Sequence, residues 1–172
     1  MSQPTLYLFV GYPGAGKTTI ARIITDLTGG VHLWADFERH VMFKNPTHSK
    51  EESRELYDHL NRVADELLAQ GKCVIYDTNF NFRSDRDHLR QIAAKNGADT
   101  IVIWVTTPRE LAERRATKES ENEDTRIWGN MSLQTFNRMS DNLQQPDDDE
   151  KVIQIDGTDI DSAAIKQQLG LE

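Results

Sequence analysis

The stretch GYPGAGKT at residues Gly11–Thr18 matches the pattern GxxxxGK[ST] near the start of this 172-residue chain. Glycines in such a stretch let the backbone turn tightly, so that successive N–H groups point inward around a phosphate. The apolar run Leu6–Val10 before it is typical of a buried strand, and the apolar spacing of residues 18–27 after it is typical of a helix. That helix would direct the positive end of its dipole at the same anion. The stretch therefore predicts a loop that binds the phosphates of a nucleoside triphosphate.

Two side chains of this loop carry the expected chemistry. Lys17 would supply a positive charge to the β and γ phosphates, and the hydroxyl of Thr18 would be a ligand of Mg²⁺. The residues predicted to bind the nucleotide are those of the loop and the first helical turn, namely Gly11, Pro13, Gly14, Ala15, Gly16, Lys17, Thr18 and Thr19.

Strand and helix patterns alternate along the whole chain. Strands are expected at 6–10, 31–35, 73–76, 100–105 and 151–155, and helices at 18–27, 51–70, 84–96, from 108, at 132–145 and at 159–169. Strands separated by helices pair in parallel through right-handed crossovers, so we predict a three-layer α/β/α sandwich around about five parallel strands. Thr107-Pro108-Arg109-Glu110 has the form of a capping box with proline at the first helical position.

Two carboxylates are expected at the carboxyl edge of this sheet, where ligands bind in open parallel sheets. Asp77 follows the third strand and would orient a magnesium-bound water beside the loop. Asp36 follows the second strand and could accept the proton of a substrate hydroxyl that attacks a γ-phosphate. Arg39 would share a face with Asp36 if the segment is helical, and could hold the substrate or a phosphate oxygen.

The helix expected from Pro108 carries Arg114 and Arg115, whose positive charges could neutralise a triphosphate. The polar stretch 118–126, KESENEDTR, has no apolar residue, so we interpret residues 112–131 as a lid that closes over the nucleotide. Ion pairing of these cations with Glu110, Glu113 and Glu119 on the same helix is the alternative interpretation.

Composition narrows the class of protein. With 28 acidic and 20 basic residues the net charge is −8, which argues against a duplex-binding protein. The single cysteine, Cys73, excludes an intramolecular disulfide, and no apolar stretch approaches the roughly 18 residues that span a membrane. With no secretory signal pattern at residues 1–16, we expect a cytoplasmic protein without a membrane partner, folded as one domain over residues 1–172.

Four segments together resemble a known group of enzymes. GYPGAGKTT, DFER after the second strand, VIYDTNF after the third and the arginine-bearing helix are similar to the P-loop kinases of the polynucleotide-kinase and zeta-toxin-like group, within the AAA-type ATP-binding P-loop NTPases. The resemblance implies the sheet order 2-3-1-4-5, ATP and Mg²⁺ as cofactors, Asp36 as general base and Arg39 near the scissile bond.

The expected activity is therefore transfer of the γ-phosphate of ATP to a hydroxyl of a small molecule, a nucleotide or a polynucleotide 5′ end. Its catalytic residues would be Asp36, Lys17, Arg39 and Arg115. A P-loop ATPase or nucleotide-binding switch protein without an acceptor remains the alternative. Asp77 is followed by Thr78 rather than by a water-activating Glu, and no NKxD-like tetrapeptide is present, which argues against a ring-forming ATPase and a GTPase.

Overall fold

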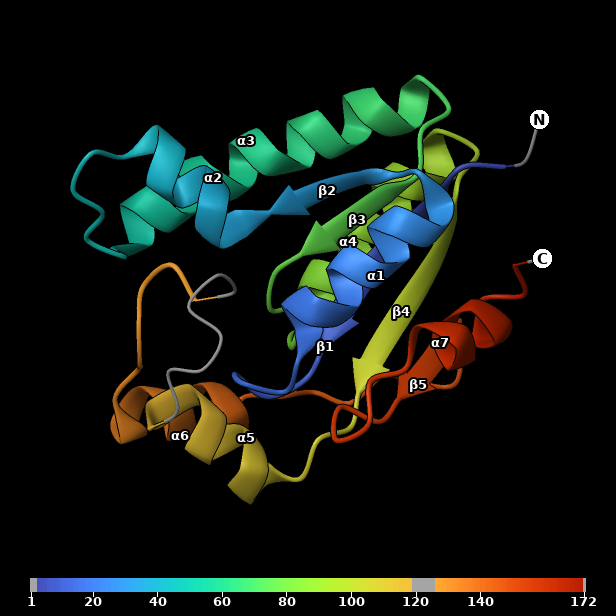
Figure 1. The fold of residues 1–172 in the computed structure, drawn as a ribbon. Coiled ribbons are helices and arrows are strands. Elements are labelled where there is room, and N and C mark those ends of the chain that lie inside the picture. Colours follow the sequence, from blue (N-terminus) through green and yellow to red (C-terminus); the bar gives the residue numbers. More distant parts are fainter. Residues whose placement is uncertain (1–2, 119–125, 172) are drawn as a thin grey trace.

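The computed structural model describes residues 3–118 and 126–171, and its core is a sheet in which every strand pair is parallel. The strands are β1 (Thr5–Val10), β2 (Val31–Trp34), β3 (Val74–Asp77), β4 (Asp99–Val105) and β5 (Val152–Ile155). They are arranged in the order β2-β3-β1-β4-β5 (Figure 1). The parallel sheet and its order confirm the fold expected from the sequence.

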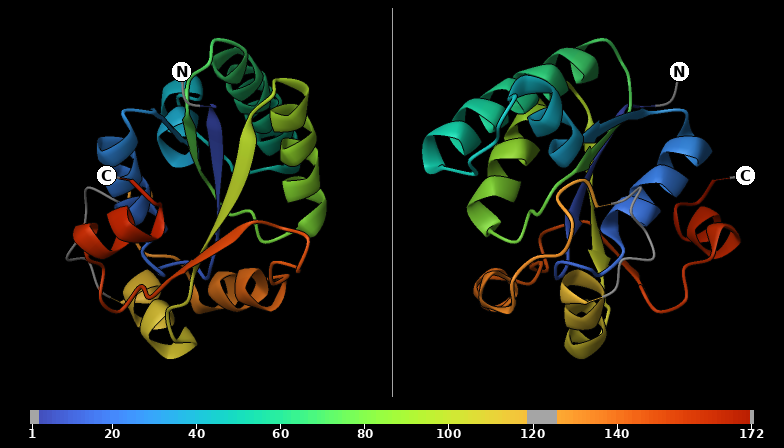
Figure 2. Two further views of the ribbon diagram at one scale, coloured as in Figure 1. Left: turned by 90° about the vertical axis from the view of Figure 1, so that its right-hand side faces the viewer. Right: turned by 60° about the vertical axis from the view of Figure 1, so that its left-hand side comes forward.

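Helices cover both faces of this sheet. They are α1 (Lys17–Thr28), α2 (Ala35–Met42), α3 (Lys50–Ala69), α4 (Arg83–Lys95), α5 (Arg109–Thr117), α6 (Leu133–Asp141) and α7 (Ser162–Gln168). Figure 2 shows the sheet between α3 and α4 on one side and α1 and α7 on the other. Each face has its own buried apolar cluster, which accounts for the strongly apolar strands.

The long helix α3 shows why the pattern was readable. Its buried Leu56, Leu60, Ala64 and Leu68 recur every four residues and therefore lie on one face. The side chain of Ser49 accepts a hydrogen bond from Glu52 N and so caps the first turn. Local sequence and tertiary packing agree along this element.

Some boundaries differ from the prediction for physical reasons. The helix expected at 132–145 ends at Asp141, because the chain before Pro146 is held to the loop between β3 and α4 by a hydrogen bond of 2.8 Å from Gln144 N to Asn81 O. The capping box expected before α5 is absent. Its Thr107 hydroxyl instead donates to Ala15 O at 2.7 Å, and the helix begins at Arg109 after an extended Pro108.

Two helices, α5 and α6, lie together beyond the carboxyl ends of β1 and β4 (Figure 1). Phe136 of α6 packs with Ala112 and Ala116 of α5, and Tyr12 of the glycine-rich loop packs against this cluster. The middle of the predicted lid, residues 119–125, lies outside the described residues.

Within the described ranges, no helix combines the length and the apolar character needed to cross a membrane.

Candidate active site

The glycine-rich loop turns between β1 and α1 in a conformation that its glycines make possible. Gly14 and Gly16 have φ values of 79° and 106°, in the left-handed region that other residues rarely adopt. Gly14 also lies directly against the backbone of α5 at Ala112, where a Cβ atom would collide. α1 begins at Lys17, so its N-terminal N–H groups face the inside of the loop.

Two buried side chains fasten this loop, and neither was identified from the sequence. Asn81 pairs with Gly11: its Oδ1 accepts from Gly11 N at 3.1 Å and its Nδ2 donates to Gly11 O at 3.2 Å. Thr107 donates to Ala15 O, as described above. Both residues follow strands at the carboxyl edge of the sheet, which is the signal that could have found them.

The ammonium of Lys17 lies over the loop. Its Nζ donates to Gly11 O at 3.0 Å and to Tyr12 O at 2.7 Å. Burial lowers the pKa of Lys17 to about 8, and the nearby carboxylates of Asp77 and Asp36 oppose this shift. The structure therefore brings the predicted Lys17, Asp36 and Asp77 together, and it places Thr18 half-buried in the first turn of α1.

Asp77 ends β3 and is buried, with 4% of its surface exposed. Its Oδ2 lies 3.0 Å from Nε2 of His32, a residue of the neighbouring strand β2 that the sequence did not single out. His32 stacks in turn on Trp34, with ring centroids 6.0 Å apart. The contact with His32 holds the Asp77 carboxylate at the carboxyl edge of the sheet.

Asp36 is the second residue of α2, and its side chain reaches solvent. The surrounding protein displaces water from the carboxylate, and this desolvation together with the charge of Asp77 raises the pKa of Asp36. The positive charges of Arg39, His48 and Lys17 act in the opposite direction. A carboxylate with a raised pKa and access to solvent is suited to accept a proton.

Arg39 lies one turn beyond Asp36, but its guanidinium is buried and bonded to α3. Its Nη1 donates to Glu52 Oε1, and its Nη2 donates to the Ser53 hydroxyl at 3.1 Å. Burial alone would raise the pKa of Glu52, but hydrogen bonds from Thr47, Arg39 and His48 outweigh it and lower the pKa to about 2. The segment is helical, which was the condition for Arg39 to share a face with Asp36, but the pairing of Arg39 with Glu52 could not be predicted from the spacing.

The cations of α5 differ in their surroundings. Arg115 donates from Nη1 to Gly157 O at 3.0 Å, so it is turned toward the loop between β5 and α7, whereas Arg114 is exposed. Beyond the undescribed part of the lid, Trp128 packs edge-on against His48 and obliquely against His40, with ring centroids 5.2 and 5.8 Å away. The end of the predicted lid therefore meets the α2–α3 side of the site.

The composition of the site fits a nucleotide with Mg²⁺. The loop offers inward N–H groups and a lysine to phosphates, and Thr18 and Asp77 are oxygen donors of the kind that Mg²⁺ prefers. Among the described residues, no group of three or more His, Cys, Asp or Glu side chains is placed to form an all-protein metal cage.

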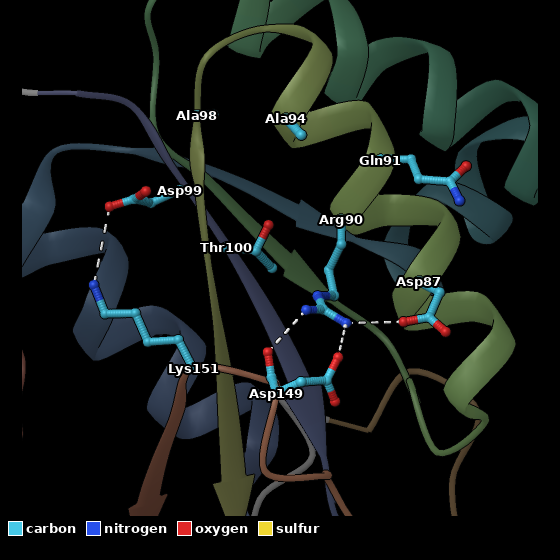
Figure 3. A pocket seen from close by; sticks show the side chains of 9 residues that line it. All are labelled: Asp87, Arg90, Gln91, Ala94, Ala98, Asp99, Thr100, Asp149 and Lys151. Atoms are coloured by element: carbon cyan, nitrogen blue, oxygen red, sulfur yellow. Dashed lines mark hydrogen bonds and ion pairs between the residues drawn. The ribbon is translucent and has the colours of Figure 1, made fainter.

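A groove of about 540 Å³ lies elsewhere, between α4 and the start of β4 (Figure 3). The charged side chains along it bind one another: Arg90 donates to Asp87 at 3.0 Å and to the backbone oxygen of Asp149 at 2.9 Å. Lys151 pairs with Asp99 at 3.9 Å. The groove contains no residue of the glycine-rich loop, and it is separate from the candidate site described above.

Comparisons with known proteins agree with the fold. A family model described as an AAA domain matches residues 6–146. A candidate kinase from Chloroflexus aurantiacus superposes with a TM-score of 0.75 at 21% identity, covering 99% of this chain and 96% of that one. The APS kinase CysC of Mycobacterium tuberculosis, solved with AMPPNP and APS, gives a TM-score of 0.69 at 17% identity and 99% coverage of both chains. A chain of the Pnkp1/Rnl/Hen1 RNA repair complex gives a TM-score of 0.66 at 23% identity, and the match covers 83% of this chain and 45% of that one. No curated protein sequence matches the chain.

Proposed function

The chain belongs to the AAA domain family, and from that premise we propose that it is an ATP-dependent kinase that transfers the γ-phosphate of ATP to an acceptor hydroxyl. One observation carries the proposal. Lys17 begins α1, the exposed Asp36 lies in the first turn of α2 and the buried Asp77 ends β3, so all three lie at the carboxyl edge of the sheet, where the two carboxylates act on the charge of Lys17. A nucleotide-binding loop beside a carboxylate with a raised pKa is what transfer to an alcohol requires.

In this proposal the loop and the N-terminus of α1 bind the triphosphate through backbone N–H groups and Lys17. Thr18 directly and Asp77 through water would hold Mg²⁺, which when bound supplies positive charge to the phosphates. Arg114 and Arg115 of α5 neutralise further charge at the side of the triphosphate. These roles follow from residue type and from their place along the carboxyl edge of the sheet.

Asp36 acts as the general base on the acceptor side. Its carboxylate orients the attacking hydroxyl and takes its proton as the oxygen bonds to the γ-phosphorus and the bond to the leaving ADP oxygen breaks. Arg39 lies one helical turn away and is bonded to Glu52, and its positive charge acts to lower the pKa of Asp36. We assign it to keeping this carboxylate ionised and aimed at the acceptor.

The acceptor is proposed as a small molecule, a nucleotide or a polynucleotide 5′ end. Proteins with the same fold are named for very different acceptors, APS for CysC and gluconate for the gluconokinase of Sinorhizobium meliloti 1021, so the fold leaves this choice open. The net charge of −8 favours a small molecule over a long nucleic acid.

Replacement of the base tests the proposal. We expect Asp36→Asn to lower phosphoryl transfer by about 10²–10⁴-fold while ATP binding stays within about twofold, because the substitution removes a proton acceptor and leaves the loop intact. The acceptor would first be found by screening radiolabelled ATP against nucleosides, 5′-hydroxyl oligonucleotides, sugars and aminoglycosides.

Asp26→Asn is the matched control, since Asp26 is exposed on α1 away from the sheet edge. It should leave both ATP binding and transfer unchanged. If Asp36→Asn turns over ATP at the normal rate and no acceptor stimulates turnover of the unaltered protein, the chain is an ATPase or a switch and not a kinase.

A further inference from the structure

Where the chain leaves β1, the side chain of Asn81 makes the hydrogen bonds to Gly11 that a neighbouring strand would otherwise make. It satisfies both backbone groups of Gly11, accepting from N at 3.1 Å and donating to O at 3.2 Å, and only 2% of its surface is exposed. Because one partner group is a donor and the other an acceptor, only one orientation of the amide fits. Gly11 is therefore hydrogen-bonded although it has already left the sheet to begin the loop.

The carbonyl oxygen of Gly11 is shared. It also accepts from Lys17 Nζ at 3.0 Å, and the same ammonium donates to Tyr12 O at 2.7 Å. A lysine that moves to a phosphate moves away from these carbonyl oxygens, and a buried carbonyl without a donor is costly. At Gly11 the Asn81 amide remains as a donor when Lys17 leaves.

Building on the nucleotide binding proposed above, we propose that Asn81 is a positioning residue of the phosphate-binding loop. It keeps Gly11 hydrogen-bonded while Lys17 exchanges its loop carbonyls for a triphosphate. Asn81 itself does not touch the nucleotide in this account. It acts through Gly11 and lowers the cost of releasing Lys17.

The backbone on both sides of Asn81 is held, so that the amide is preorganised for this task. Asn81 O accepts from Gln144 N at 2.8 Å, and Phe80 N donates to Phe9 O at 3.0 Å. Phe80 O accepts from Nη1 of Arg86 at 2.9 Å, and Arg86 is fully buried. In this proposal the amide therefore keeps its position on Gly11 when Lys17 leaves.

The test is the affinity for a fluorescent ATP analogue, mant-ATP with Mg²⁺, which needs no acceptor. We expect Asn81→Ala to raise the dissociation constant about tenfold, because binding now leaves the Gly11 carbonyl without a donor. The control is Asn61→Ala, which removes a hydrogen bond from the Tyr76 hydroxyl of 2.9 Å on the α3 side of the sheet. It should lower the melting temperature to a similar degree and leave the affinity unchanged.

A double-mutant cycle separates positioning from a merely structural role. In a Lys17→Met background no ammonium needs release, so Asn81→Ala should then weaken mant-ATP binding by less than about twofold. An unchanged affinity of Asn81→Ala, or an equal loss in both backgrounds, overturns the role of Asn81 and leaves the kinase proposal intact. If the unaltered protein fails to bind mant-ATP, both proposals fall.

Discussion

Two buried arginine–glutamate pairs lie near the site, one near the phosphate-binding loop and one near Asp36, and they join different parts of the chain. Arg86 and Glu150 are both fully buried, with bonds of 2.7 and 3.1 Å between them. Arg39 and Glu52 are 7% and 8% exposed, and the charge of Arg39 acts on Asp36. The first pair joins α4 to the chain before β5, whereas the second joins the neighbouring helices α2 and α3.

Two ion pairs of the same residue types can thus have different roles, one in folding and one in the reaction, depending on the residues around them. Arg86 also donates to backbone oxygens of Phe80 and Gln144, and so stands behind Asn81 and the phosphate-binding loop. Arg39 donates to the Ser53 hydroxyl in addition to Glu52, and its charge acts on the proposed base. We therefore expect the first pair to govern folding and the second to govern the acceptor reaction.

The largest effect is expected when the first pair is broken. Glu150→Gln should lower the free energy of unfolding by about 3–5 kcal/mol, because it leaves the buried Arg86 without its counter-charge. Urea unfolding measures this loss. A loss below about 1 kcal/mol for Glu150→Gln would contradict the structural role.

A smaller and more selective effect is expected at the second pair. Glu52→Gln should weaken the apparent affinity for the acceptor about tenfold, comparable to one lost hydrogen bond to a charged group, while ATP affinity stays unchanged. Steady-state kinetics with each substrate varied measures the two separately. Glu55→Gln, on the exposed side of the same helix, is the control. An equal loss of affinity for ATP would erase the distinction between the pairs.

We also expect the affinity of the phosphate-binding loop for nucleotide to depend on pH. Since burial lowers the pKa of Lys17 to about 8, its positive charge is lost as the pH rises through that value. Nucleotide affinity should then fall by up to about tenfold per pH unit, and Lys17→Arg should give a flat profile over the same range. Fluorescence titration with mant-ATP between about pH 7 and 9.5 tests this, and a flat profile for the unaltered protein would contradict it.

Much of the phosphate side was predictable because its information is local. The eight residues Gly11–Thr18 contain the turn glycines, the lysine and the helix start in one stretch. Asp36 and Asp77 could be singled out because carboxyl ends of parallel strands meet at one edge. The fold order came from the family resemblance and was confirmed by the sheet.

The remaining partners could not be predicted because they are set by tertiary contacts. Asn81 meets Gly11 across 70 residues, and Thr107 meets Ala15 across 92. The sequence predicted that the Thr107 hydroxyl caps a helix, but it donates to the loop carbonyl of Ala15, and α5 begins after Pro108 without a side-chain cap. Arg39 likewise follows the expected spacing, while its binding to Glu52 depends on how α2 packs on α3.

Tyr12 has a consequence for how such a protein could change over generations. Its ring lies 6.5 Å from that of Phe136, and the Arg109 guanidinium lies 5.9 Å from each ring. These contacts join the loop to α5 and α6 rather than to α2 and α3. A lineage could therefore rebuild the acceptor half for a different alcohol and inherit its nucleotide-handling half unaltered.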